Sequence, residues 1–354
     1  MSTEENTSMS EETRTPQEVP TPIPAESTPT PTPSFEINSE LKKLQDGVAA
    51  IRFELNKVIV GQKELIEALI IGIVADGNCL IEGVPGIAKT LSAKLLAKTM
   101  NVDFSRIQFT PDLMPSDILG TSVFNPKNTE FEFKAGPIFS NIVLIDEINR
   151  APAKTQSALF EAMAEKQITI DGKQHTMEQP FIILATQNPI EQEGTYRLPE
   201  AQLDRFLFKI NIDYPTMEEE TQILTAHNSR HGKDEMAEVK AILNAQDIAE
   251  LQQIAKNVTV ESSIINYIAK LVNQTRNHPM LYLGASPRAS ISILNAAKAK
   301  AATNGRDFVI PEDVKSIAAL ALRHRVVVSP EKEMEGISPD MIVQEMIEST
   351  EIPR

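Results

Sequence analysis

The chain of 354 residues, 41% of them hydrophobic, is long enough for about two domains with sizeable cores. Its single cysteine, Cys79, excludes an internal disulfide, and its longest apolar run, 69–74, is far too short to cross a bilayer. The net charge is −15, and no block is basic enough to indicate sequence-independent nucleic-acid binding. We therefore expect a cytoplasmic protein with no membrane span and no nucleic-acid partner.

The two ends of the chain differ in composition from the middle. Residues 1–39 hold seven prolines and a charge of −6 with almost no apolar residues, so they cannot bury enough surface to offset chain entropy. We predict a disordered head there. Residues 329–354 form an acidic tail whose one amphipathic stretch, 341–347, could dock on the body of the protein or on a partner.

Helical spacing of apolar residues predicts a first helix from a cap at Ser39 to about residue 55 and a second over 63–75. The turn between them, 58–62, is apolar and contains Gly61. Such a turn just before the first strand either contacts a nucleotide base or packs in the core, and both interpretations stay open at this point.

The next segment predicts a phosphate-binding loop. A short apolar strand at 79–81 leads into Gly83-Val84-Pro85-Gly86-Ile87-Ala88-Lys89-Thr90, and a helix follows from Leu91. Backbone N–H groups of such a loop and of the new helix point at phosphate, while Lys89 would reach the β- and γ-phosphates and Thr90 would hold Mg²⁺. Ala88 stands where the usual pattern has glycine, so we expect the neighbouring glycines to carry the sharp turn.

A strand is expected at 106–110, followed by an insertion. Two short runs of alternating apolar residues, 120–124 and 130–133, predict a β-hairpin across the turn at 125–128. Insertions of this kind usually contact substrate or neighbouring subunits.

A second chemical motif follows the continuous apolar strand 141–145, which is typical of a strand buried on both faces of a parallel sheet. Asp146 and Glu147 stand at its carboxyl end. Beside a phosphate loop, Asp146 should hold Mg²⁺ and Glu147 should polarise the attacking water, although acids after a strand also serve as helix caps.

The remaining elements alternate in the same way. We expect a long helix over 148–167, a second hairpin over 167–177 with an Asp-Gly turn, and buried strands at 181–187 and 208–212. Asn188 follows the first of these strands, where its amide could orient water near the γ-phosphate. Arg205, at the end of a short helix over 198–206, is either a surface ion-pair partner of Asp204 or reaches another subunit's nucleotide.

From residue 216 to about 328 the pattern is helical. Within it, Ser286-Pro287-Arg288 places an arginine in the first turn of a helix, against the preference set by the helix dipole, which marks Arg288 as a functional candidate. The expected helices span 216–229, 246–256, 261–276, 287–303 and 311–323.

From about residue 40 to 328 the chain resembles the MoxR family of AAA+ ATPases, within the helix-2-insert group. The resemblance rests on the segments 83–90, 108–113, 135–139, 146–152, 185–206 and 284–289. It implies an α/β P-loop NTPase fold with a parallel sheet and β-hairpin insertions, plus a C-terminal all-α lid. The implied domains are 40–215 for nucleotide binding and 216–328 for the lid, between the head 1–39 and the tail 329–354.

The resemblance also implies roles for individual residues. The loop 83–90 with its Ala88 corresponds to Walker A, Asp146 and Glu147 to Walker B, and Asn188 to sensor 1. Arg205 corresponds to the arginine finger and Arg288 to sensor 2. The nucleotide-binding set is completed by Leu91 and Gly61, and the cofactors are ATP and Mg²⁺. The hairpins at 118–134 and 167–178 correspond to elements that line the pore or axial face.

For the whole protein, the resemblance implies an ATPase that forms a homo-hexamer or other ring. It would act with a von Willebrand factor A-type partner as a chaperone-like remodelling or maturation factor for protein clients. A magnesium-chelatase-like role is harder to exclude, whereas a DNA-acting motor is disfavoured because the hairpin at 118–134 carries no basic excess. A non-hydrolysing nucleotide switch is disfavoured because Glu147 and Asn188 are both present. A phosphotransferase would give no reason for the acid pair and the lid.

Overall fold

The computed structural model of the protein describes residues 39–84, 86–189, 195–232 and 234–353. The head expected to be disordered lies, up to residue 38, outside the described residues. None of the described helices combines the length and the apolar character that crossing a membrane requires.

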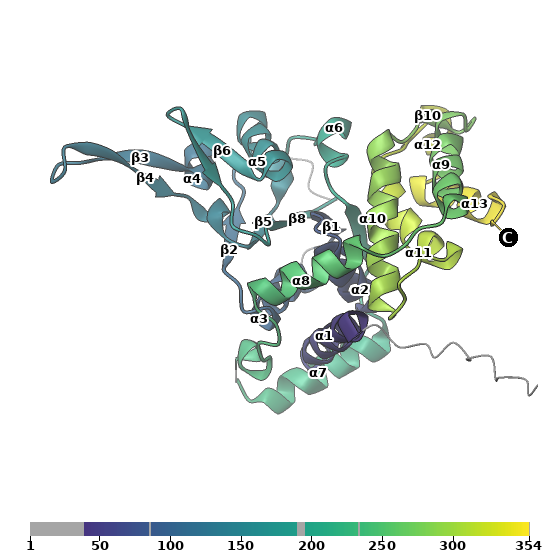
Figure 1. The fold of residues 1–354 in the computed structure, drawn as a ribbon, viewed down its shortest axis with the longest axis horizontal. Helices are drawn as coiled ribbons and strands as arrows, with labels where there is room; N and C mark the ends of the chain where they lie inside the picture. The colour runs from purple at the N-terminus through teal and green to yellow at the C-terminus, as the bar shows by residue number, and fades with distance from the viewer. Residues whose placement is uncertain (1–38, 85, 190–194, 233, 354) are drawn as a thin grey trace, which may run out of the picture. The chain divides into compact units, whose positions relative to one another are not determined.

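A five-stranded parallel sheet forms the centre of the N-terminal half of the described chain (Figure 1). Its strand order is β2-β5-β8-β1-β9, so the strand that precedes the phosphate loop lies inside the sheet between β8 and β9. The strand bounds are β1 Cys79–Gly83, β2 Phe104–Gln108, β5 Ile142–Asp146, β8 Ile182–Gln187 and β9 Phe208–Ile212.

The central strands are apolar along most of their length because both faces of the sheet are covered. Along β1, Cys79 and Ile81 pack in one core cluster and Leu80 packs in the other. Burial of Cys79 raises the pKa of its thiol to about 12, so this residue is a packing group rather than a nucleophile.

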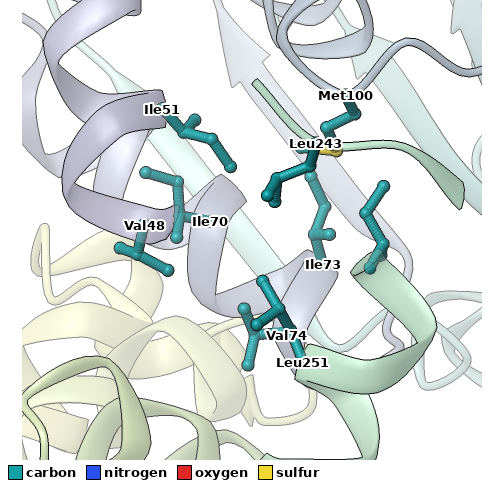
Figure 2. Close-up of a pocket in the computed structure, with 9 residues that line it drawn as sticks. Val48, Ile51, Ile70, Ile73, Val74, Met100, Leu243 and Leu251 are labelled. Carbon is teal, nitrogen blue, oxygen red and sulfur yellow. The ribbon is translucent and has the colours of Figure 1, made fainter. Parts of the chain in front are cut away.

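Helices α1 Ser39–Leu55, α2 Lys63–Val74 and α3 Lys89–Thr99 cover one face of the sheet, and α5 Ala153–Glu165 covers the other. Side chains from α1, α2, Met100, Leu243 and α8 (Ala245–Lys256) converge on one apolar hollow (Figure 2). Its volume of about 10 Å³ is at or below what one water molecule needs, so these elements are closely packed.

Both expected hairpins are confirmed. Strands β3 Gly120–Asn125 and β4 Glu130–Ala135 follow the short helix α4 Pro115–Leu119, and Figure 1 shows them extending away from the sheet. Strands β6 Gln167–Ile170 and β7 Lys173–Thr176 turn at Asp171 and Gly172, whose φ values of 50° and 74° suit a tight hairpin turn.

The prediction of one long helix over 148–167 is wrong in its bounds. A 3₁₀ turn, η2 Ile148–Arg150, comes first, and α5 begins only after Pro152. Proline suits a helix start because it has no N–H to contribute. The short helix α6, Glu200–Leu203, likewise starts after Pro199 and ends before Arg205.

The described part of the C-terminal half is mainly helical and includes a two-stranded pairing of β10 Leu281–Leu283 with β11 Val327–Val328. Its α8 and α10 pack on α1 and α2 of the N-terminal half. The helix bounds are α7 Met217–Arg230, α9 Ser262–Arg276, α10 Pro287–Thr303 and α11 Pro311–Leu322. A short 3₁₀ turn, η3 Glu235–Glu238, lies between α7 and α8, and another, η1 Pro137–Phe139, lies between β4 and β5.

The segment expected to be an acidic tail contains two helices, α12 Pro330–Met334 and α13 Pro339–Ser349. Helix α13 packs on α11 and α9 and buries Ile342, Val343, Met346 and Ile347. The amphipathic stretch at 341–347 therefore docks on the body of the protein, as its helical spacing allows.

His324, just after α11, is a buried histidine whose pKa lies well below its usual value because burial disfavours the charged ring and Arg325, Lys209 and Arg323 repel it. The unfolded chain binds a proton near pH 6.5 and the folded chain does not, so stability should fall as the pH drops below about 6.5. The expected slope from this group is up to about 1.4 kcal/mol per pH unit.

Denaturant unfolding at pH 7, 6 and 5 measures this slope. His324→Gln, which keeps a donor for the Phe206 carbonyl, should be less pH-dependent than the wild type over this range. His231→Gln, at an exposed position, is the matched control and should retain the wild-type slope. Equal slopes for all three proteins would contradict the assignment.

Candidate functional site

The loop after β1 has the backbone that an anion site needs. Gly86 has a φ of 88°, and a Cβ built there would meet no atom within 4 Å. Ala88 also takes the left-handed conformation, with φ 61° and ψ 18°, so Gly86 carries the sharp turn together with Ala88. The small methyl group of alanine tolerates this conformation at a modest cost. No side chain of the described residues caps the start of α3, which leaves its first N–H groups available to an anion.

Gly83 serves close packing. A Cβ at Gly83 would lie 2.5 Å from Ile87 Cδ1 and 2.8 Å from the carbonyl oxygen of Ile212. Val84 follows it, half-buried, and Pro85 lies outside the described residues. The Lys89 ammonium lies over the loop. It donates to the Gly83 carbonyl and, at 3.5 Å, to the Gln187 carbonyl. These contacts hold the cation at the end of β1 and β8.

Thr90 and Asp146 meet at the carboxyl end of the sheet. The Thr90 hydroxyl donates to the two carboxylate oxygens of Asp146 at 3.3 and 3.4 Å. Asp146 is only 6% exposed. It also accepts from the Thr186 hydroxyl at 3.1 Å and from Arg106 Nε at 2.6 Å. A buried carboxylate with this many donors is held in one position.

Glu147 sits on strained backbone, with φ 56° and ψ 52°, and its N–H donates to Thr186 Oγ1 at 3.1 Å. Its carboxylate oxygen Oε2 accepts from Gln108 Nε2 at 2.7 Å and from Arg150 at 2.9 Å. A left-handed conformation in a residue other than glycine persists only where the surroundings impose it, and such residues gather at functional sites.

These residues line one cavity of about 170 Å³. Asn188, 8% exposed, lines it from the end of β8. The fold therefore brings together Walker-type residues that the sequence separates by about a hundred positions. The lining residues are Gly86, Lys89, Thr90, Arg106, Gln108, Asp146, Glu147, Thr186 and Asn188.

A second cavity, of about 250 Å³, shares Gly86 with the first. The turn at 58–62 forms one wall, Ile87, Ala88 and Leu91 a second, and α7 with η3 a third. Gly61 itself has a φ of 67° and faces Glu219 at the start of α7. The sequence left open whether this turn contacts a nucleotide base or packs in the core. In the structure the turn lines a cavity, and its Val58 and Ile59 are also buried in the core.

Comparisons with known proteins identify the family of the chain. A family model described as "ATPase family associated with various cellular activities (AAA)" matches residues 78–208, and one for the "AAA lid domain" matches 273–346. Chaperone MoxR1 of Mycobacterium tuberculosis is 44% identical over 311 residues, which cover 85% of this chain and 81% of that protein. The chain belongs to the MoxR family of AAA+ ATPases.

Further relatives match a similar share of the chain. The uncharacterised protein YeaC of Bacillus subtilis is 45% identical over 299 residues, covering 84% of this chain and 92% of its own length. The crystal structure of a candidate ATPase from Cytophaga hutchinsonii has a TM-score of 0.83 and is 44% identical in sequence. The match covers 89% of this chain and 98% of that chain. The lid match reaches residue 346, past the expected end of the lid at 328.

Two arginines assigned by the MoxR resemblance stand apart from the cavity lining. Arg205 donates from Nη1 to the Phe160 carbonyl of α5 at 2.9 Å. Arg288 is exposed in the first turn of α10, which Ser286 caps. Neither is among the described residues that line either cavity.

Arg106, Gln108 and Thr186 are site residues that sequence reasoning missed. Arg106 and Gln108 alternate along β2, and the pairing of Gln108 with Asp146 aligns this strand end with the acid pair. The signal in the sequence was a pair of polar residues at i, i+2 in a strand beside Walker B, but strand order was needed to interpret it.

Proposed function

We propose that this MoxR-family ATPase hydrolyses ATP with the help of Mg²⁺ in the cavity between the phosphate loop and the acid pair. The supporting observation is that Lys89, Thr90, Asp146, Glu147 and Asn188 all line that one cavity. Each would have the role expected from its chemistry. The adjoining apolar cavity at 58–62 would take the adenine base, since it joins the first at Gly86.

The residues present fit magnesium. The described residues contain no group of three or more His, Cys, Asp or Glu side chains suited to a metal, and Mg²⁺ in nucleotide sites is typically held by few protein oxygens together with phosphates. Thr90 Oγ1 and the Asp146 carboxylate, 3.3 Å apart, are such a pair. When bound, the metal would neutralise charge that develops on the phosphate oxygens.

The other groups act on the nucleotide and the attacking water. Lys89 would exchange its carbonyl partners for β- and γ-phosphate oxygens, since its ammonium already lies at the loop. Glu147 would accept a proton from the water, and the Asn188 amide would orient that water. The N–H groups at the start of α3 would donate to phosphate oxygens.

The family is the basis for proposing a wider role. We infer a ring, in which Arg205 reaches the nucleotide of a neighbouring subunit, and a chaperone-like action on protein clients with a von Willebrand factor A-type partner. Two features support it. The MoxR1 relative is named a chaperone, and the β3–β4 hairpin presents an exposed aromatic pair, Phe124 and Phe131, stacked edge to face at 5.4 Å.

Phosphate release from ATP by the purified full-length protein tests the proposal. Activity should require Mg²⁺, fall to background with excess EDTA, and return when Mg²⁺ is restored. Lys89→Ala should lose ATP binding as well as turnover, because it removes the ammonium that would bind the β- and γ-phosphates in this cavity. Turnover that persists undiminished in EDTA would refute the metal-assisted site.

A further inference from the structure

One carboxylate joins two functional segments that are distant in sequence. Asp204 Oδ2 accepts a hydrogen bond from Ser286 Oγ at 2.8 Å, and Asp204 Oδ1 accepts from Arg325 Nε at 2.8 Å. Asp204 immediately precedes Arg205. Ser286 caps the helix whose first turn carries Arg288, accepting from the Arg288 N–H at 3.1 Å. Asp204 thus links the segment that carries Arg205 to the cap of the helix that carries Arg288.

Arg325 fixes the backbone around Arg205 from the lid side. Its side chain is 2% exposed, and it donates to the carbonyls of Asp204 at 3.1 Å, Phe206 at 2.5 Å and Leu207 at 3.2 Å. It also reaches Ser292 Oγ of α10 at 3.0 Å. His324 adds a contact of 3.1 Å between its Nε2 and the Phe206 carbonyl.

Separating the 204–207 segment from Ser286 and Arg325 would be energetically costly. A buried guanidinium that loses its carboxylate and carbonyl partners leaves an uncompensated charge, which is much more costly than the loss of a surface ion pair. Ser286 and Arg325 belong to lid elements that pack on each other, because α10 and α11 are close neighbours. When the lid shifts, the segment 204–207 is therefore expected to follow it. The contact of Arg205 with the α5 carbonyl of Phe160 must then adjust.

We infer that Asp204, held by Ser286 and Arg325, is a positioning residue that couples the lid of one subunit to the placement of its own Arg205 at the neighbouring subunit's active site. The inference rests on the proposed function, which supplies the shared site. It assigns a transmitting role to three side chains that themselves contact no nucleotide.

Ser286→Ala is the mildest change that breaks the link, because the buried pair of Asp204 and Arg325 remains. The test mixes two kinds of chain. Donor chains carry Lys89→Ala, so they bind no nucleotide and supply only Arg205. Acceptor chains carry Arg205→Ala, so they bind ATP and need a neighbour's arginine. Turnover of the mixture reports on the donor's Arg205 alone.

Adding Ser286→Ala to the donor should lower turnover of the mixture about tenfold, the change expected when one hydrogen bond to a charged group is lost from the placement of a catalytic residue. The same change in the acceptor should alter it less than about threefold, because the acceptor has no Arg205 to position. Ser286→Thr in the donor keeps a capping hydroxyl and should restore the rate.

Ser338→Ala in the donor is the matched control. Ser338 caps α13 by accepting from the Met341 N–H at 3.3 Å, so the variant loses a helix cap without touching Asp204 and should keep the parent rate. The coupling is refuted if Ser286→Ala acts only in the acceptor, or if Ser338→Ala in the donor has the same effect as Ser286→Ala. If the parent mixture itself does not hydrolyse ATP, the shared site of the proposed function fails, and the coupling fails with it.

Discussion

Glu147→Gln is expected to bind ATP as the wild-type protein does and to lower its turnover by roughly 10²- to 10⁴-fold, the usual contribution of a general base. Binding would rest on Lys89, Thr90 and the loop backbone, none of which the amide changes. Glutamine is close to glutamate in size and can keep an oxygen for Gln108 and Arg150 to donate to. What it lacks is the capacity to accept a proton from water.

Binding of a fluorescent ATP analogue and release of phosphate, measured on the same preparation, separate the two effects. Glu161→Gln, at an exposed position on α5, is the matched control and should hydrolyse ATP at the wild-type rate. Asp146→Asn provides a contrast, because it changes the proposed metal ligand. If Glu147→Gln retains the wild-type rate, Glu147 is not the base.

Arg205→Ala is expected to bind ATP normally and to lose turnover by roughly 10³-fold or more, which is the effect of removing an arginine that stabilises transition-state charge from a neighbouring subunit. The position of Arg205 supports this reading. Its guanidinium donates to the Phe160 carbonyl, and Arg205 is not among the described residues lining its own subunit's cavities. Turnover of the wild-type protein should also rise with protein concentration as rings assemble.

Mixing gives the sharper measurement. Arg205→Ala subunits should regain activity with Lys89→Ala subunits, because each supplies what the other lacks at a shared interface. Arg288→Ala subunits should gain nothing from the same partner, because the lid would bring Arg288 to the nucleotide of its own chain. A mixture that stays inactive while rings are observed would refute the shared site, and so would a fully active Arg205→Ala protein.

The sequence by itself determined the local chemistry of the site. Lys89 and Thr90 lie three and four residues after Gly86, and Asp146 and Glu147 end one apolar strand, so the mutual positions within each group are set by a few backbone angles. The continuous apolar runs determined that the strands are buried on both faces. The positions of the two hairpins, with the Asp-Gly turn of the second, were also readable from the sequence.

Two helices start later in the structure than the periodicity predicts, because each begins only after a proline, Pro152 or Pro199. Ala88 has a positive φ in the structure, whereas the neighbouring glycines were expected to carry the turn. In both cases a single residue's backbone preference is weak or competes with its neighbours, so periodicity over a window does not resolve it.

Contacts between residues far apart in the chain were decided only by the tertiary structure. Arg106 meets Asp146 because β2 pairs with β5 in one register. Helix α7 closes the apolar cavity over the turn at 58–62, and Arg325 and Ser286 meet at Asp204 across about 80 to 120 residues of sequence. Strand order and helix packing fix these partners, and both depend on the burial of whole surfaces rather than on any local pattern.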